Sequence, residues 1–91
     1  MDFEWDTHKA DTNKKKHGVS FQEAASVFAD GLSVTYHDPD HSVTERRHIT
    51  IGQSRMGRTL MVSHTDRGEA VRIISARKLT RQERNQYEEG K

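Results

Sequence analysis

The order of apolar and polar residues near the N-terminus predicts a helix over residues 7–17. Asp6 stands at the N-cap position, and Gly18 stands where a glycine ends a helix. Ala10 is the only aliphatic residue between them, and one helix face carries Lys9, Asn13, Lys16 and His17. Two interpretations stay open: a surface helix held by the aromatic residues that precede it, or a face that meets an anionic ligand.

The second helix has a more usual pattern. Ser20-Phe-Gln-Glu23 has the form of a capping box, which predicts the helix start. Apolar residues follow at the spacing of one buried face, and Asp30-Gly31 ends the pattern. We expect this helix to be scaffold, with its buried face formed by Phe21, Ala24, Ala25 and Phe28.

The rest of the chain alternates between apolar and polar positions, which is typical of strands. We predict a short edge strand around residues 3–5 and further strands at 32–36, 47–52, 58–66 and 70–77. Arg67-Gly68 is predicted to form the centre of a two-residue hairpin turn. That turn would place Val62 opposite Ile73, Ser63 opposite Arg72 and His64 opposite Val71.

In this register the sheet has one apolar and one mixed face. The apolar face, expected to pack against helices, contains Ile49, Ile51, Leu60, Val62, Val71 and Ile73. The mixed face, suited to lining a groove, contains His48, Thr50, Thr59, Met61, Ser63, Arg72 and Ile74. A sheet with one wet face is ordinary for antiparallel pairing, so the groove is permitted by the pattern and not demanded by it.

A second capping box, Thr80-Arg-Gln-Glu83, predicts a closing helix to about Glu89, with Tyr87 as its only apolar residue. The predicted order is β-α-α-β-β-β-β-α. This order indicates an α+β fold with a small antiparallel sheet, two N-terminal helices and one C-terminal helix. We expect residues 1–91 to form one domain.

A short segment, His37-Asp-Pro-Asp-His41, combines two His and two Asp. These side chains suit a metal site. Proline and aspartate also mark turns, and no regular element would fix the ligands, so we favour a solvated loop and predict no metal.

Composition narrows the function classes. The chain has no cysteine, which excludes disulfides, thiol catalysis and cysteine-ligated zinc. No apolar run approaches the length of a membrane span, and the N-terminus is acidic, unlike a secretion signal. With 31% apolar and 32% charged residues the core must be thin. We expect a soluble, cytoplasmic protein.

The net charge of +1 hides an asymmetry, because residues 51–91 carry nine Lys or Arg against five Asp or Glu. An arginine-rich half suggests a polyanionic partner, since the guanidinium fork suits phosphate. Arg, Lys and His around a small sheet also suit metal-free RNA cleavage by the 2′-hydroxyl. That reaction needs a base, an acid and fixed cations at the phosphorus oxygens.

Motifs spread over residues 3–90 together resemble the BrnT family of toxins. They are Phe3-Glu-Trp-Asp6, Lys9-x-x-x-Asn13, Lys16-His-Gly-Val-Ser-Phe-x-Glu-Ala24, Phe28-x-Asp30, Gly57-Arg58-x-Leu60, Arg72-Ile-Ile-Ser-Ala-Arg77 and Glu83-Arg84-x-x-Tyr87. The chain departs from the family pattern at Arg46 and His48, where an acid and an aromatic residue are expected.

The resemblance implies a RelE-like fold and the toxin half of a bacterial type II toxin–antitoxin pair. It implies an endoribonuclease that cleaves RNA without a metal or cofactor and arrests translation. It also implies a BrnA-like antitoxin that neutralises the toxin, carries the DNA-binding domain and represses the operon together with it. DNA contact would therefore be indirect, through the antitoxin, and no membrane partner is expected.

The site residues follow from the resemblance together with the charge pattern. We expect Arg72 and Arg77 to hold phosphate charge, and His17, His64 or Tyr87 to transfer protons. RNA contacts are expected from Lys9, Asn13, Lys16, Arg47, Arg58 and Arg67. Structural alternatives stay open: Arg77 with Glu83 as an ion pair that holds the last helix, Tyr87 as a core residue, and His64 as a strand-end residue.

Two other functions compete with the ribonuclease. A non-catalytic α+β module would bind nucleic acid or an acidic protein in a salt-sensitive way without strand scission. A metal hydrolase using residues 37–41 would lose its activity in chelator.

Overall fold

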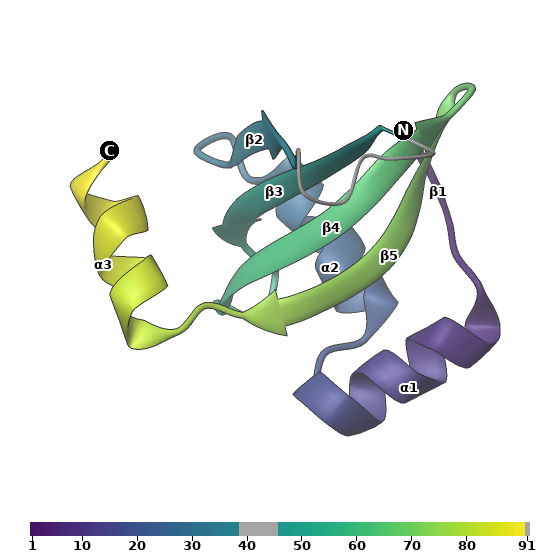
Figure 1. Cartoon of the computed structure of the whole chain (residues 1–91), viewed down its shortest axis with the longest axis horizontal. Helices are drawn as coiled ribbons and strands as arrows, with labels where there is room; N and C mark the ends of the chain where they lie inside the picture. The colour runs from purple at the N-terminus through teal and green to yellow at the C-terminus, as the bar shows by residue number, and fades with distance from the viewer. Residues whose placement is uncertain (39–45, 91) are drawn as a thin grey trace.

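A computed structural model describes residues 1–38 and 46–90 of the chain. It contains the expected α+β order, with a five-stranded sheet in the order β1-β5-β4-β3-β2 (Figure 1). The strands are β1 (Asp2–Glu4), β2 (Val34–His37), β3 (Arg47–Gln53), β4 (Thr59–Arg67) and β5 (Ala70–Lys78). The sheet is mixed, because β1 joins β5 in parallel while the other neighbours are antiparallel.

The helices are α1 (Thr7–His17), α2 (Phe21–Ser26), a 3₁₀ turn η1 (Val27–Ala29) and α3 (Arg81–Glu89). The predicted caps of α1 are confirmed: Asp6 accepts from the Lys9 amide, and Gly18 is left-handed with φ 71°. Both bonds of the α3 capping box are present. In α2 only Ser20 makes its capping bond, because the Glu23 side chain turns to Ser54 and Arg58.

One face of the sheet is covered by α2, while α3 stands beyond the end of β5, away from α1 and α2 (Figure 1). The core lies between α2 and the covered face and contains Val19, Phe21, Ala24, Val27, Leu60, Val62, Ile73 and Ala76. Aromatic pairs close its N-terminal side: Phe3 on Phe28 at 5.2 Å, and Trp5 on Phe21 at 6.0 Å between ring centroids. Within residues 1–38 and 46–90, no helix lies over the centre of the opposite face, which we call the open face (Figure 1).

The predicted hairpin register was wrong. Gly68 and Glu69 form the turn, Arg67 pairs with Ala70, and His64 lies opposite Ile73. Gly68 has φ 61° and no non-glycine residue among those described has positive φ, so glycine occupies the first central position, as in a type II′ turn. Opposite Ser63 and His64, β5 contains a bulge of one extra residue. This bulge shifts the register once more, so that Ser63 pairs with Ser75.

The predicted face of β3 was also wrong. Thr50 lies opposite Val62 and faces the core, 1% exposed, whereas Ile49 lies opposite Ser63 on the open face. The buried hydroxyl of Thr50 is tolerated because Thr35 Oγ1 and His64 Nε2 lie 2.7 Å from it. The hydrogen bonds available to Thr50, and not the hydrophobicity of Ile49, therefore decide which side of β3 faces the core.

Candidate functional site

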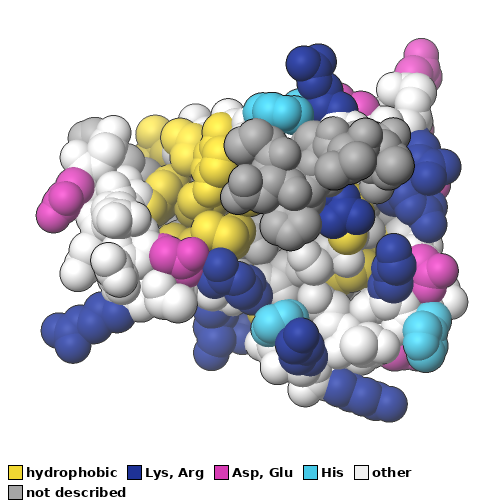
Figure 2. All heavy atoms as spheres, viewed as in Figure 1, with side chains coloured by type: hydrophobic (Ala, Val, Ile, Leu, Met, Phe, Trp, Pro, Cys, Tyr) yellow, Lys and Arg dark blue, Asp and Glu magenta, His cyan; other side chains and the backbone are white. Residues whose placement is uncertain are grey.

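A hollow of about 340 Å³ lies on the open face of the sheet. Its walls come from the C-terminus of α1, the end of β2 and the three central strands. Basic side chains surround this side of the molecule (Figure 2). We call this hollow the cationic groove; it is lined by His17, Asp38, Arg47, Ile49, Met61, Ser63, Ser75, Ala76 and Arg77.

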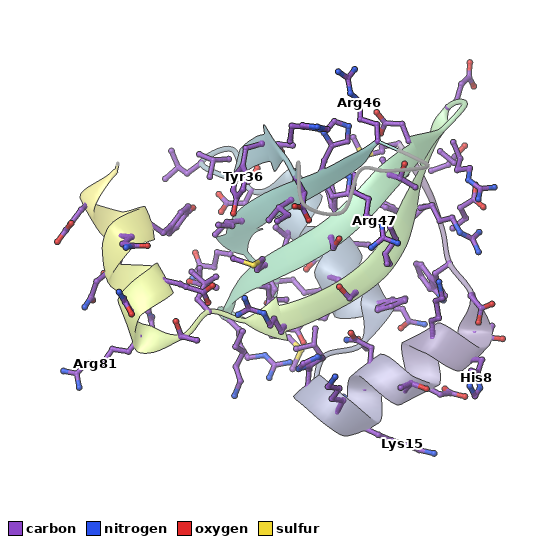
Figure 3. The ribbon with its side chains drawn as sticks, viewed as in Figure 1. His8, Lys15, Tyr36, Arg46, Arg47 and Arg81 are labelled. Atoms are coloured by element: carbon purple, nitrogen blue, oxygen red, sulfur yellow. The ribbon has the colours of Figure 1, made fainter. Side chains whose placement is uncertain are left out.

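Cross-strand pairing builds the floor of the groove. Ser63 on β4 lies between Ile49 and Ser75, and Met61 lies opposite Arg77. Arg47 begins β3 and crosses in front of the sheet in Figure 3, on the side away from α2. The floor is thus a narrow polar and apolar strip with cations at its rim.

The bulge in β5 turns two of these side chains outward. Ile73 and Ala76 are both buried against the helices, so one extra residue, Ile74, lies between two core positions. Strict alternation from Ile73 would have pointed Ser75 and Arg77 into the core. The bulge places both on the open face instead.

Asn13 fixes α1 against β5 and thereby positions His17. Its buried amide donates to the carbonyls of Val19 and Ala76, at 3.0 and 2.8 Å, and accepts from the Ala76 amide at 3.1 Å. All of these bonds are internal, so Asn13 anchors α1; the RNA contact that we expected from it stays a prediction. His17, four residues further on the same side, lines the groove.

A neighbouring hollow of about 360 Å³ extends the basic surface along α1. Lys9, Lys16 and His17 line it together with Ile74 and Ser75. His17 and Ser75 therefore belong to both hollows. The two expected lysines lie beside the groove and not within it.

Arg77 is held by Glu83 from α3. Two parallel hydrogen bonds join the guanidinium to the carboxylate, at 2.8 and 2.9 Å. The Arg77 bond and the Thr80 amide lower the pKa of Glu83 to about 2, and the same pair raises the pKa of Arg77. The ion pair that we considered as the structural alternative for Arg77 is therefore present. The guanidinium nevertheless lines the groove, and its Nη2 lies 3.3 Å from the sulfur of Met61.

His64 faces the other side of the sheet. It is 4% exposed, packs on Phe28 with 4.9 Å between ring centroids, and lies 2.7 Å from Thr50 Oγ1. Burial, assisted by the neighbouring His48, lowers its pKa to about 4. A neutral imidazole on the covered face has no route to a substrate in the groove, so we remove His64 from the site.

Three expected arginines also lie outside the groove. Arg58 binds the buried carboxylate of Glu23, and this ion pair joins α2 to the β3–β4 turn. Arg67 is exposed at the tip of the β4–β5 hairpin. Arg72 is on the open face but pairs with Glu4 at 2.9 Å, about 16 Å along β5 from Arg77 at ~3.3 Å per residue.

Tyr87 lines a different hollow, between α3 and the sheet. Its hydroxyl donates to the carbonyl of Leu32 at 3.2 Å, and the ring is only half-buried, so it is not the core residue we considered. Tyr36, on the sheet side of this hollow, has a raised pKa, chiefly because of burial and the nearby Glu83 carboxylate.

Neither a metal cluster nor a membrane span is found in the part of the chain that the structure describes. No group of three or more His, Asp or Glu side chains is arranged to hold a metal there, and no helix is long and apolar enough to cross a membrane. The segment considered for a metal site lies partly outside the described residues, which end at Asp38 and resume at Arg46.

Sequence reasoning missed several groove residues. Ser75 stood within the Arg72–Arg77 motif, but its outward direction depends on the bulge. Asp38 stood in the suspected turn, and Ser63 was on the mixed face without a role. Their clustering depends on pairing between strands, which no local pattern in the sequence records.

Comparison with known proteins identifies the family and supports the fold. Residues 5–83 match the family model described as the ribonuclease toxin, BrnT, of type II toxin–antitoxin systems. A crystal structure of the Brucella abortus ribonuclease toxin BrnT is similar over 89% of this chain and 99% of that one, with 25% identity and a TM-score of 0.66. No curated protein sequence matches the chain.

Proposed function

Since the chain belongs to the BrnT family of ribonuclease toxins from type II toxin–antitoxin systems, we propose that its cationic groove is the site of RNA cleavage. The single observation that carries this proposal is the convergence of His17, Arg47 and Arg77 around one open hollow. These side chains supply an imidazole, which can act as an acid or a base, and two fixed positive charges.

The reaction we propose uses the RNA strand's own 2′-hydroxyl and no metal. The 2′-oxygen attacks the adjacent phosphorus and the bond to the 5′-oxygen breaks, which leaves a 2′,3′-cyclic phosphate and a 5′-hydroxyl. One proton leaves the 2′-hydroxyl and one reaches the 5′-oxygen. His17 serves one of these transfers; the assignment of base and acid stays open.

Arg47 and Arg77 stabilise the charge that gathers on the phosphorus oxygens. Glu83 holds the guanidinium of Arg77 by two of its donors. The donor directed at the Met61 thioether meets only a weak acceptor, so a phosphate oxygen can take it without breaking the ion pair. The ion pair therefore orients Arg77 for its task.

The direct test uses toxin freed of its antitoxin and incubated with single-stranded RNA in EDTA. We expect strand scission with cyclic phosphate ends, and no scission where 2′-deoxyribose replaces ribose. Arg77→Ala should lower the cleavage rate about 100-fold. Arg81→Ala, which removes an outward-pointing charge from α3 (Figure 3), is the matched control. Equal rates in both variants would remove Arg77 from the site.

The partner we propose is a BrnA-like antitoxin that neutralises the toxin, carries the DNA contact and represses the operon with it. The family match supports an antitoxin partner. Growth arrest on expression of the toxin, relieved by co-expression of the neighbouring gene, tests neutralisation. A complex that shifts operator DNA, while the toxin alone does not, tests the indirect DNA contact.

A further inference from the structure

A second hollow of about 420 Å³ separates α3 from the sheet. Its sheet wall is apolar and includes Val34, Ile51 and Met61, and its α3 wall carries Gln86 and Tyr87. Hydrophobic side chains gather on this part of the surface, next to the basic region (Figure 2). Tyr36 also lines it and is 46% exposed, so the ring is accessible from solvent.

This hollow adjoins the cationic groove. Met61 lines both, and Arg77 lies opposite Met61 in the sheet while its partner Glu83 lines the second hollow. Tyr36 pairs with Ile49, which lines the groove. The next pair on the same face of these two strands lies two residues further on, about 7 Å from the Tyr36–Ile49 pair at ~3.3 Å per residue. A molecule held by phosphate at Arg77 would therefore have this aromatic chamber beside it.

The chemistry of the chamber matches a nucleobase. Tyr36 on β2 and Tyr87 on α3 bring aromatic rings from two elements, and bases stack on such rings without regard to sequence. Ile51 and Met61 give an apolar floor that a phosphate or a metal ion would not enter. The Gln86 amide can both donate to and accept from a base edge.

We infer that the hollow between α3 and the sheet is a nucleobase subsite, which takes the base of a nucleotide next to the scissile phosphate of single-stranded RNA. This inference rests on the proposed function, because the phosphate must lie in the cationic groove. An apolar protein segment is the competing occupant. The shared Met61 wall beside the groove and the tyrosines on both walls favour the base.

The subsite also explains why α3 is attached as it is. Its two tethers, Arg77–Glu83 and the Tyr87 bond to Leu32, hold the helix on either side of the chamber without filling it. No residue of α3 is buried. A helix that served only the core would turn an apolar stripe inward.

The test measures binding of a short single-stranded RNA made uncleavable by 2′-O-methyl groups, with an abasic nucleotide placed at each position in turn. For the wild-type toxin, freed of antitoxin, we expect one position at which loss of the base weakens binding about tenfold. Tyr36→Ala should abolish that penalty, and Tyr36→Phe should keep it. Circular dichroism checks that each variant is folded. Gln86→Ala is a second variant, from the α3 wall of the hollow, and we expect it to change which base is preferred at that position.

A penalty that is the same in wild type and Tyr36→Ala overturns the subsite, as does the absence of any sensitive position. If Tyr36→Ala weakens antitoxin binding and leaves the abasic penalty intact, the occupant is the protein and the inference is wrong. Wild-type toxin that neither binds nor cleaves RNA overturns the proposed function as well.

Discussion

Two of the arginine–glutamate pairs in the molecule lie in different settings. Arg58 and Glu23 join α2 to the covered side of the sheet, and the Glu23 side chain is 2% exposed. Arg77 and Glu83 join α3 to the open side, and their side chains are 38% and 30% exposed. The same chemical pair holds the fold together in one region and leaves a charge available to a ligand in the other.

The difference follows from what surrounds each carboxylate. Glu23 also accepts a hydrogen bond from Ser54 at 2.7 Å, and Arg58 also donates one to the Gly18 carbonyl. The covered pair is therefore part of a closed hydrogen-bond network. Among the described residues, Arg77 bonds to the Lys78 carbonyl and the Met61 sulfur besides Glu83. Burial makes the first pair necessary for stability, while exposure makes the second pair available for function.

Removing Arg58 should have the largest effect on stability. Arg58→Ala leaves the buried Glu23 carboxylate without its cation, which should lower the free energy of unfolding by about 3 kcal/mol. Urea denaturation measures this loss. A Glu23→Leu, Arg58→Met double variant should recover most of it, since no charge is then left buried. A cost no greater than that of Glu83→Ala would contradict the comparison.

His64, also on the covered side, should make stability depend on pH. Its pKa in the folded protein is about 4, below the ordinary value near 6.5, so the unfolded chain binds the proton first as pH falls. The stabilisation is complete above pH 6.5 and is lost between pH 6.5 and 4, by about 3 kcal/mol. Unfolding of wild type and His64→Gln across this range should differ in slope; parallel curves would show that His64 titrates normally.

The open-side pair should affect activity more than stability. Glu83→Ala should cost less than ~1 kcal/mol of stability, because the pair is exposed. It should nevertheless slow RNA cleavage about tenfold, since Arg77 loses its orientation. Glu88→Ala, which breaks the exposed Arg84–Glu88 pair on the same helix, is the control and should change neither. Matching cleavage rates for the two variants would assign Glu83 a purely structural role.

The local part of the fold could be predicted from the sequence, and the pairing of distant segments could not. Asp6, Gly18 and Thr80 set helix ends through bonds to residues three or four positions away, so those ends are readable in a short window. The face of β3 depends on Thr50 meeting Thr35 and His64, which no such window contains.

The site divides in the same way. His17 and Arg77 were expected, and the groove contains both. His64 and Arg58 were expected in the site because of their chemistry. Partners more than ten residues away in the chain hold each of them on the covered side. Residue type indicated which reactions are possible, and tertiary pairing decided which side chains can meet a substrate.

The extra residue in β5 is one that the strand could lose without exchanging its two faces. Deleting Ile74 would restore even alternation after Ile73, with Ser75 and Arg77 still on the open face and Ala76 still towards α2. Because a bulge bends its strand and increases the local twist, the shortened protein would keep the side chains of the groove and lose that curvature beneath them.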